Sequence, residues 1–208
     1  MNKFFTADWH AGEAQSINTH SYLRQHPTDA MVEQWLKNAH EHVESEEDEI
    51  IFVGDIGITL SDDMTVLHAL PKCKKTFVLG DKEYASKYFT LEQFKAMMAE
   101  NFPEIVVCQN TKVKVRSNTF FVSHKPTDCF AQEMPSICGH IHGTWRTQKM
   151  NNGQPIINVG VDTWGGLVTE NFIDHQFNAI TKGYYDINCF PNLWQPGMEG
   201  HISPSSGK

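Results

Sequence analysis

The sequence predicts an α/β protein in which two β-sheets lie in contact, and three observations lead to this class. First, three short apolar runs in the first half each end on an aspartate and are separated by segments that suit helices, a pattern typical of parallel strands joined by crossovers. Second, the pattern changes after residue 105 to short strands with hairpin turns. Third, no segment rich in Pro, Gly or Ser separates the halves, so we expect one domain over residues 1–195 and a flexible tail over 196–208.

The composition agrees with a soluble globular protein. With 208 residues, of which 40% are hydrophobic and 20% charged, the chain can bury an ordinary core. Its formal charge of −8 disfavours nonspecific attraction to nucleic acid or to an anionic membrane. We find no signal peptide and no apolar run near the ~20 residues that span a bilayer. The five cysteines form no C-x-x-C pair, which favours reduced thiols and a cytoplasmic location.

Three predicted strands in the first half end on carboxylates. Residues 3–7 run into Asp8-Trp9-His10, residues 49–53 into Gly54-Asp55, and residues 75–79 into Gly80-Asp81. The carboxyl ends of parallel strands meet at one edge of a sheet, which is where ligand sites lie in such folds. Three carboxylates should therefore lie together at that edge.

Two helices are predicted between and after these strands. Residues 28–43 carry apolar side chains at helical spacing, so one face of this helix should pack on a sheet. Further along, Thr90 and Gln93 match a capping box, while Phe89 and Phe94 have the spacing of a hydrophobic staple. A second helix should therefore begin directly after Thr90.

The second half reads as an antiparallel or mixed sheet. Ser117-Asn118 and Asn152-Gly153 are plausible hairpin turns, and the second pair predicts a type I′ turn. The six expected strands cover residues 105–108, 112–116, 120–124, 137–140, 148–150 and 156–159.

Potential metal ligands follow several of these strands. The seven candidates are Asp8, His10, Asp55, Asp81, His124, His140 and His142. Carboxylates and imidazoles that converge at one edge repel one another and are costly to desolvate, so the arrangement implies bound cations. Seven ligands exceed what one tetrahedral zinc accepts, and two metals become possible if Asp55 bridges them. Such a pair of metals suits hydrolysis at phosphorus.

The ordered series of motifs resembles the calcineurin-like metallophosphoesterase superfamily. Residues 4–142 contain Asp8-x-His10, Gly54-Asp55, Gly80-Asp81-Lys82-Glu83, His124 and Gly139-His140-x-His142, where the family has D-x-H, G-D, G-N-H-[D/E], H and G-H-x-H. Residues 158–162 are also similar to a stretch in small bacterial and phage members. The resemblance implies a four-layer α/β/β/α sandwich, with two mixed sheets flanked by helices and a dinuclear metal site at the sheet edge.

The resemblance also implies which residues hold each metal. Asp8, His10, Asp55 and His142 would hold the first ion, whereas Asp55, Asp81, His124 and His140 would hold the second. Mixed histidine and carboxylate ligands without thiolate suit manganese, iron, zinc or nickel better than calcium. Of these ions we expect two Mn²⁺, with iron, zinc and nickel as alternatives.

The third motif departs from the family pattern at two positions. Asp81 replaces an asparagine and adds a negative charge, which would make the second metal a weaker Lewis acid. Lys82 replaces a histidine that often protonates the leaving group, and a lysine, with a reference pKa near 10.4, is poorly matched to that task. We predict Lys82 as a catalytic residue that holds a phosphate oxygen; the alternative is a solvated lysine paired with Glu83. The enzyme should then prefer good leaving groups or take its acid from His20 or His26.

Trp9 lies between two of the predicted ligands and has two interpretations. It is either a packing residue of the core or a platform on which a nucleobase or aromatic leaving group stacks.

The function that follows is a metal-dependent phosphoesterase. A metal-bridging hydroxide would attack the phosphorus of a small phosphomonoester or phosphodiester, with a nucleotide as one candidate substrate. One alternative is a nuclease acting on DNA or RNA, which the acidic balance and the lack of a basic stripe disfavour. The other is a catalytically impaired scaffold that binds proteins, since a fold does not fix a function.

Overall fold

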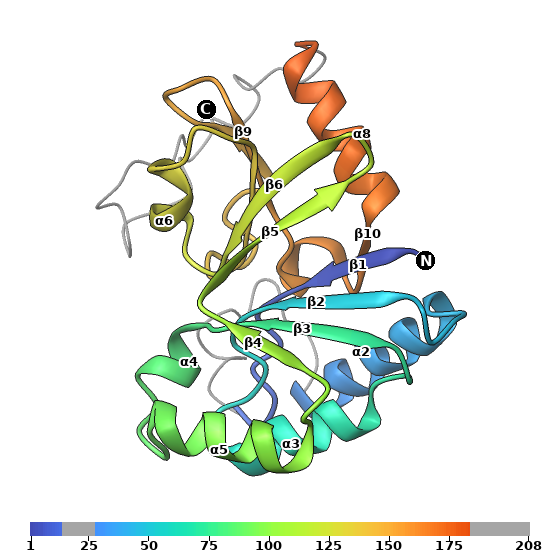
Figure 1. Cartoon of the computed structure of the whole chain (residues 1–208), viewed down its shortest axis with the longest axis vertical. Helices are drawn as coiled ribbons and strands as arrows, with labels where there is room; N and C mark the ends of the chain where they lie inside the picture. The colour runs from blue at the N-terminus through green and yellow to red at the C-terminus, as the bar shows by residue number, and fades with distance from the viewer. Residues whose placement is uncertain (14–27, 184–208) are drawn as a thin grey trace, which may run out of the picture.

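The first of two sheets carries the parallel strands expected from the first half of the chain (Figure 1). The computed structural model describes residues 1–13 and 28–183, so the predicted tail at 196–208 lies outside the described residues. The sheet has the order β10-β1-β2-β3-β4, in which β10 alone is antiparallel to its neighbour. Its strands are β1 (Lys3–Thr6), β2 (Glu49–Val53), β3 (Lys74–Val78), β4 (Val106–Cys108) and β10 (Val168–Thr169).

The second sheet is mixed and has the order β5-β6-β7-β9-β8. Its two edge pairs are antiparallel, whereas β6, β7 and β9 run parallel to one another. The strands are β5 (Asn110–Val115), β6 (Asn118–Ser123), β7 (Ser136–Cys138), β8 (Thr147–Lys149) and β9 (Pro155–Asn158). Together with β4, these are the six strands expected from the second half, each shifted by no more than a few residues.

Both predicted hairpins form, but their turns differ from the expectation. Val115 pairs with Asn118, so the first turn is made by Arg116 and Ser117, and Arg116 adopts a positive φ of 54°. In the second hairpin Gly153 has a φ of 81°, whereas Asn152 is not among the described residues with positive φ. A type I′ turn requires positive φ at both positions, so that prediction is wrong.

Three longer helices cover the outer face of the first sheet: α2 (Thr28–His42), α3 (Leu60–Ala69) and α5 (Leu91–Asn101). The predicted start of α5 is confirmed, because Thr90 Oγ1 accepts from the Gln93 amide at 3.2 Å and the Gln93 side chain accepts from the Thr90 amide at 2.8 Å. The rings of Phe89 and Phe94 stack with centroids 6.1 Å apart, as a staple requires. None of the described helices is long and apolar enough to cross a membrane.

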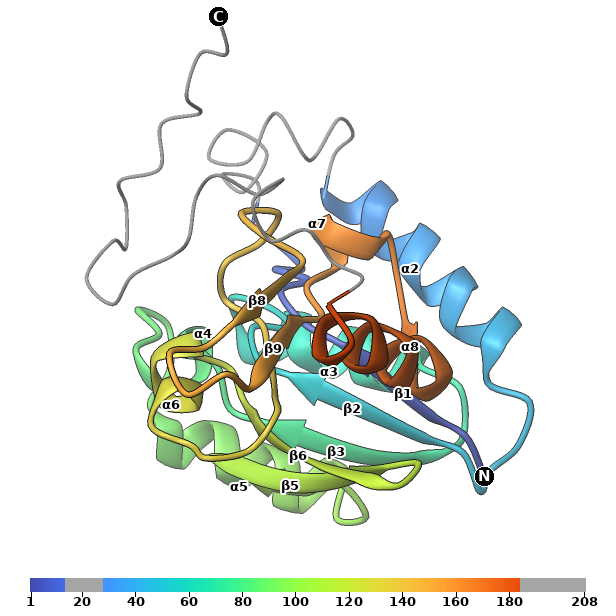
Figure 2. The same ribbon diagram turned by 90° about the horizontal axis from the view of Figure 1, so that it is seen from above.

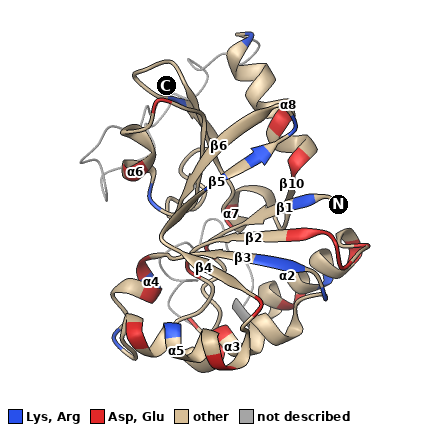
Figure 3. Cartoon of the chain, in the orientation of Figure 1, with Lys and Arg blue, Asp and Glu red and all other residues tan. Residues whose placement is uncertain are grey.

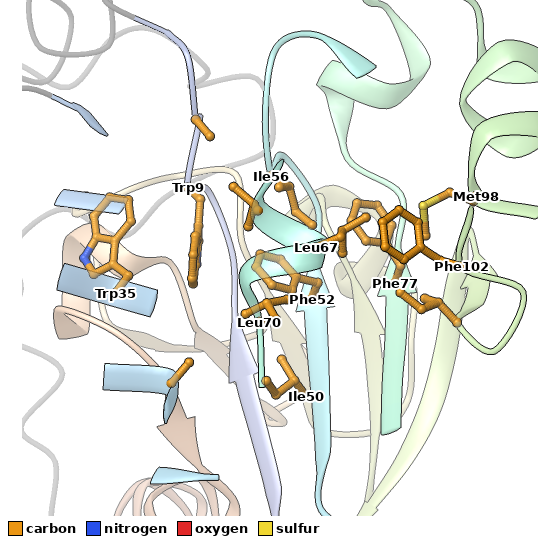
Figure 4. Packing of buried hydrophobic residues seen from close by; sticks show 14 of the residues in the cluster. Trp9, Trp35, Ile50, Phe52, Ile56, Leu67, Leu70, Phe77, Met98 and Phe102 are labelled. Atoms are coloured by element: carbon orange, nitrogen blue, oxygen red, sulfur yellow. The ribbon is translucent and has the colours of Figure 1, made fainter. Parts of the chain in front are cut away.

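Alternation along the strands gives the first sheet two buried faces, and Figure 4 shows residues of the face that packs against the helices. Ile50 and Phe52 of β2 point toward the helices, while Ile51 and Val53 point toward the second sheet. Trp9 is fully buried on the helical side, where its ring lies 5.6 Å from that of Trp35 and 5.1 Å from that of Phe52. The packing interpretation of Trp9 is therefore correct, and a fully buried ring has no free face for a substrate.

The two sheets face each other across a shared apolar core, which confirms the expected α/β/β/α sandwich. This core joins Phe5 and Val78 of the first sheet to Phe120 and Ile157 of the second. The outer face of the second sheet carries the short helix α6 (Pro126–Phe130), which packs on β6 and β7. The last described helix, α8 (Glu170–Thr181), lies against strands of both sheets, beside β1 and β9 (Figure 2).

Candidate metal centre

The seven predicted ligands lie at the carboxyl ends of strands from both sheets, close to the short helix α4 (Asp81–Tyr84). Side chains from distant parts of the chain form three overlapping groups, and within each group the potential ligand atoms lie within 4.8 Å of one another. The groups are Asp8 with His10 and His142, Asp81 with His124 and His140, and Asp8 with Asp55 and His124. The structure therefore brings together all the residues that the sequence proposed as ligands.

Asp55 lies between two of the candidate imidazole ligands. Its Oδ2 atom lies 3.7 Å from Nε2 of His10 and 3.5 Å from Nε2 of His124. One oxygen thus faces one imidazole from each of the two predicted ligand sets. The other oxygen, Oδ1, accepts a hydrogen bond from the backbone amide of Lys82 at 2.9 Å, which fixes the orientation of the carboxylate.

The backbone of the site adopts a left-handed conformation, with positive φ, that residues other than glycine rarely adopt. Five of the seven candidates have a positive φ: Asp8 at 63°, His10 at 51°, Asp55 at 56°, His140 at 73° and His142 at 50°. Each such residue costs on the order of 1–2 kcal/mol, and strain of this kind concentrates at functional sites. Cross-strand bonds, such as that from the Asp8 amide to the Gly54 carbonyl at 3.1 Å, hold the loops in place.

The charges of the site shift the pKa values of its members in different directions. Burial alone would raise the pKa of Asp55, but the neighbouring rings of His124 and His10 hold it below its ordinary value. Burial would lower the pKa of His124, yet Asp55 and Asp8 raise it to about 8. Burial lowers the pKa of His140, and the neighbouring ring of His124 lowers it further.

Two imidazole nitrogens of the site are suited to a metal ion. Three buried imidazole nitrogens have no hydrogen-bond partner within the described residues: Nε2 of His124 and both nitrogens of His10. Nδ1 of His10 faces the Glu13 carboxylate at 2.8 Å without hydrogen-bond geometry, so the two Nε2 atoms are those left for an ion. Buried polar atoms are nearly always satisfied, so such orphans indicate an additional bound group. Because both nitrogens face the Asp55 carboxylate, the donor set fits borderline divalent cations. The number and identity of the ions belong to the proposal below.

Three supporting contacts, from groups outside the seven predicted ligands, each engage the outward nitrogen of a candidate ligand. Nδ1 of His142 lies 2.5 Å from the Asp162 carboxylate, and Nδ1 of His10 lies 2.8 Å from Oε2 of Glu13. Nδ1 of His124 lies 2.7 Å from the backbone carbonyl of Val53. Contacts of this kind set the ring orientation in metal sites and leave Nε2 for the ion. Asp162 falls in the stretch 158–162 that resembles small members of the metallophosphoesterase superfamily, whereas no pattern in the sequence marked Glu13.

Both unusual residues of the third motif have a charged partner. Asp81 contacts Lys125 through Oδ1 at 2.8 Å, and the Lys82 ammonium donates to Oε1 of Glu13 at 2.9 Å. The predicted alternative, in which Lys82 pairs with Glu83, is wrong, because Glu83 is fully buried and accepts hydrogen bonds from backbone amides instead.

The side chain of Glu13 contacts both the His10 ring and Lys82, and these contacts lower its pKa to about 2 in spite of burial. His20 and His26 lie outside the described residues.

Two further carboxyl groups are buried behind the site. Burial, together with the negative charge of Asp55, raises the pKa of Glu83 to about 7. Burial, together with the negative charge of Glu83, raises the pKa of Asp63 to about 8. The Glu83 carboxylate accepts from the amides of Gly80 at 2.6 Å and Asp55 at 3.3 Å, so it ties together the two loops that present Asp55 and Asp81.

Comparison with solved structures supports the fold. A protein of unknown function from Aquifex aeolicus superimposes with a TM-score of 0.63 at 19% identity, covering 84% of this chain and 98% of that one. An archaeal phosphodiesterase gives a TM-score of 0.48 at 16% identity, covering 77% of this chain and 84% of that one. A phosphopantetheinyl hydrolase from Mycobacterium tuberculosis gives a TM-score of 0.46 at 12% identity, covering 77% of this chain and 89% of that one.

At these identities the likeness to the Aquifex protein shows a shared fold and nothing about activity. A scan against models of protein families gives no match, and a search of curated proteins finds no relative.

Proposed function

We propose that this protein is a metal-dependent phosphoesterase that hydrolyses a small phosphomonoester or phosphodiester at a dinuclear site. One observation carries the proposal: a single oxygen of Asp55 faces an imidazole from each of two ligand sets. Two cations that share a carboxylate would lie close enough to act on the same phosphoryl group. The ordered motifs of the sequence support the same reaction class.

We assign the residues to the two sets that the resemblance implies. Asp8, His10, Asp55 and His142 would hold one ion, and Asp55, Asp81, His124 and His140 the other. We propose Mn²⁺ as the ion in both sets, with iron, zinc and nickel as alternatives that the mixed histidine and carboxylate ligands also suit. When bound, the two cations would neutralise the phosphoryl oxygens and lower the pKa of a coordinated water toward neutrality.

Lys82 is the proposed catalytic residue of the chain itself. Its backbone amide orients Asp55, and its ammonium group, with the side chain 32% exposed, is held near the centre by Glu13. A fixed cation at this point would bind a phosphate oxygen and stabilise the negative charge that develops as the ester bond breaks. Glu13 is a positioning residue in this scheme, because it contacts both Lys82 and the ring of His10.

The charge distribution favours a small substrate over a nucleic acid. Over the described part of the chain, Lys and Arg are interspersed with Asp and Glu (Figure 3). A nucleic-acid surface usually gathers basic residues along one face.

A cytoplasmic location agrees with the four described cysteines, Cys73, Cys108, Cys129 and Cys138, all of which are free thiols.

The test compares the Mn²⁺-loaded protein with its Asp55→Ala variant on p-nitrophenyl phosphate and bis-p-nitrophenyl phosphate. We expect the variant to lose bound manganese and to fall in kcat by about 10³-fold or more, because one side chain serves both ions. Asp174→Ala is the matched control, since this carboxylate on α8 bonds to Asn178. Metal binding without turnover of any phosphate ester would contradict the proposal and favour a protein-binding scaffold.

A further inference from the structure

Two lysines lie at the candidate metal centre, and they differ in what they contact. Lys82 pairs with Glu13 and lines a cavity of about 330 Å³. Lys125 pairs with a candidate ligand itself, because its Nζ atom lies 2.8 Å from Oδ1 of Asp81. The other oxygen of Asp81, Oδ2, lies 3.4 Å from Nδ1 of His140. The ammonium group of Lys125 and an ion held by the second ligand set would therefore compete for the same carboxylate.

The sequence around Lys125 fixes the backbone from which this ammonium group extends. The residue lies between His124, a candidate ligand, and Pro126, the first residue of α6. A residue before proline is restricted to extended conformations, and Lys125 has a φ of −83° and a ψ of 130°. Its carbonyl accepts a hydrogen bond from the Asp128 amide at 3.2 Å, and the His124 carbonyl accepts one from the Gly139 amide at 3.1 Å. The lysine is thus anchored directly beside the centre.

The two ligand sets differ in burial and in the charges that surround them. In the first set Asp8 is fully buried, and the ring of His142 contacts the buried carboxylate of Asp162. In the second set the side chain of Asp81 is 36% exposed and contacts the cation of Lys125. A nearby carboxylate attracts a divalent ion, whereas an ammonium group repels it, and water screens the charges of an exposed group. The first set should therefore bind its ion more tightly than the second.

We propose that Lys125 is a counter-ion of Asp81 that weakens the binding of the second ion, so that the two ions bind with different affinities. This inference rests on the proposed function, which supplies the two ions. The pair depends on the unusual third motif, because the asparagine of the family pattern would not attract an ammonium group as a carboxylate does. Lys125 is a positioning residue in this scheme, since it acts on the metal through Asp81.

The test is a titration of EDTA-treated protein with Mn²⁺, followed by calorimetry, which gives a dissociation constant for each ion. We expect two steps in the wild-type protein. Lys125→Met should strengthen the weaker step about tenfold and change the tighter step less than about twofold, because the cation that competes for Asp81 is removed. Lys125→Arg keeps the charge and should retain the wild-type constants. A lysine that only supported the fold of the site would give the opposite sign, with weaker binding in Lys125→Met.

Three further variants assign the effect. His140→Ala removes a ligand of the second set alone, so it should abolish the weaker step and leave the tighter one. Lys74→Met is the matched control, because Lys74 also forms an exposed ion pair, with Glu47, but begins β3 and so lies at the end of that strand away from the centre. In an Asp81→Asn background, Lys125→Met should change the weaker constant less than about threefold, since the two residues act as a pair.

The outcomes distinguish the inference from the proposed function. If Lys125→Met leaves the weaker constant unchanged or raises it, the inference is wrong, while two bound ions and hydrolysis of bis-p-nitrophenyl phosphate keep the phosphoesterase in place. An equal effect of Lys125→Met with and without Asp81→Asn would also overturn the inference. Fewer than two bound ions in both the wild type and Lys125→Met would overturn the inference and the dinuclear site together.

Discussion

At the scale of single residues, the imidazoles of the candidate metal centre are oriented by neighbours that do not themselves face the ions. Asp162, Glu13 and the Val53 carbonyl each contact an Nδ1 atom, so the opposite nitrogen of each ring points to the shared space. A carboxylate in this position also raises the basicity of the ring that it contacts. The affinity of the centre for metal should therefore depend on residues beyond the seven ligands.

Asp162→Ala tests this dependence. Removing the carboxylate 2.5 Å from Nδ1 of His142 should weaken Mn²⁺ binding about 10- to 100-fold, because the ring loses its fixed orientation and part of its basicity. Titration calorimetry on the metal-free protein measures the change, and Asp174→Ala serves again as a control. An unchanged dissociation constant in Asp162→Ala would show that the contact does not support the ligand.

At the scale of elements, the loops after β2 and β3 approach each other so closely that a side chain would not fit between them. A Cβ atom on Gly54, which has a φ of 84°, would lie 2.4 Å from Nδ1 of His124 and 2.6 Å from the Cα atom of Gly80. A Cβ atom on Gly80 would lie 2.3 Å from Oδ1 of Asp55. The glycines thus allow the ends of two strands to bring their carboxylates to one place.

A matched pair of glycine variants separates crowding from backbone strain. Gly54→Ala and Gly165→Ala both place a side chain at a positive φ, 84° and 77°, but the space around Gly165 is open. Gly165→Ala should destabilise by about 1 kcal/mol through φ alone, and Gly54→Ala by roughly 3 kcal/mol or more, because backbone must also move. Urea unfolding of the metal-free proteins measures both. Equal losses would mean that the loops tolerate the extra atom.

At the scale of the whole molecule, the sandwich encloses carboxyl groups whose charged forms are disfavoured. Asp63 is fully buried on α3, and none of the described groups forms a hydrogen bond with its carboxylate in good geometry. With its pKa raised to about 8, this group holds a proton in the folded state that the unfolded chain releases near pH 4. Its contribution to stability is present below the unfolded pKa and is lost as the pH rises toward 8.

The stability of the protein should accordingly fall between about pH 4 and pH 8, and Asp63→Asn should flatten this dependence. A buried amide does not ionise, so we expect the variant to lose less stability across the range, by up to about 5 kcal/mol, since each unit of pKa shift corresponds to about 1.4 kcal/mol. Some slope should remain, because Glu83 has a raised pKa of about 7 and acts in the same direction. Thermal unfolding of metal-free protein from pH 5 to pH 9 measures it, and parallel profiles would contradict the role of Asp63.

Much of the sandwich and of the candidate centre could be predicted because local patterns encode them. The runs that end on Asp8, Asp55 and Asp81 predicted parallel strands with a shared edge, and the capping box at Thr90 marked the start of α5. The turn at Arg116 and Ser117 was missed by one residue, because a two-residue hairpin is set by strand register and not by the turn sequence alone. Asn152-Gly153 failed as a type I′ turn because Met150 pairs with Gln154, so the loop has three residues and only Gly153 takes a positive φ.

The sequence by itself determined the two-sheet α/β class, the seven candidate ligands and the unusual third motif, because strand ends, caps and motif spacing are properties of neighbouring residues. The tertiary structure alone decided the partners: Glu13 for Lys82, Lys125 for Asp81, and Asp162 for His142. It also decided that Trp9 belongs to the core and that a cavity adjoins Lys82. These contacts join residues far apart along the chain, so no local pattern signals them, and they exist only once both sheets have packed.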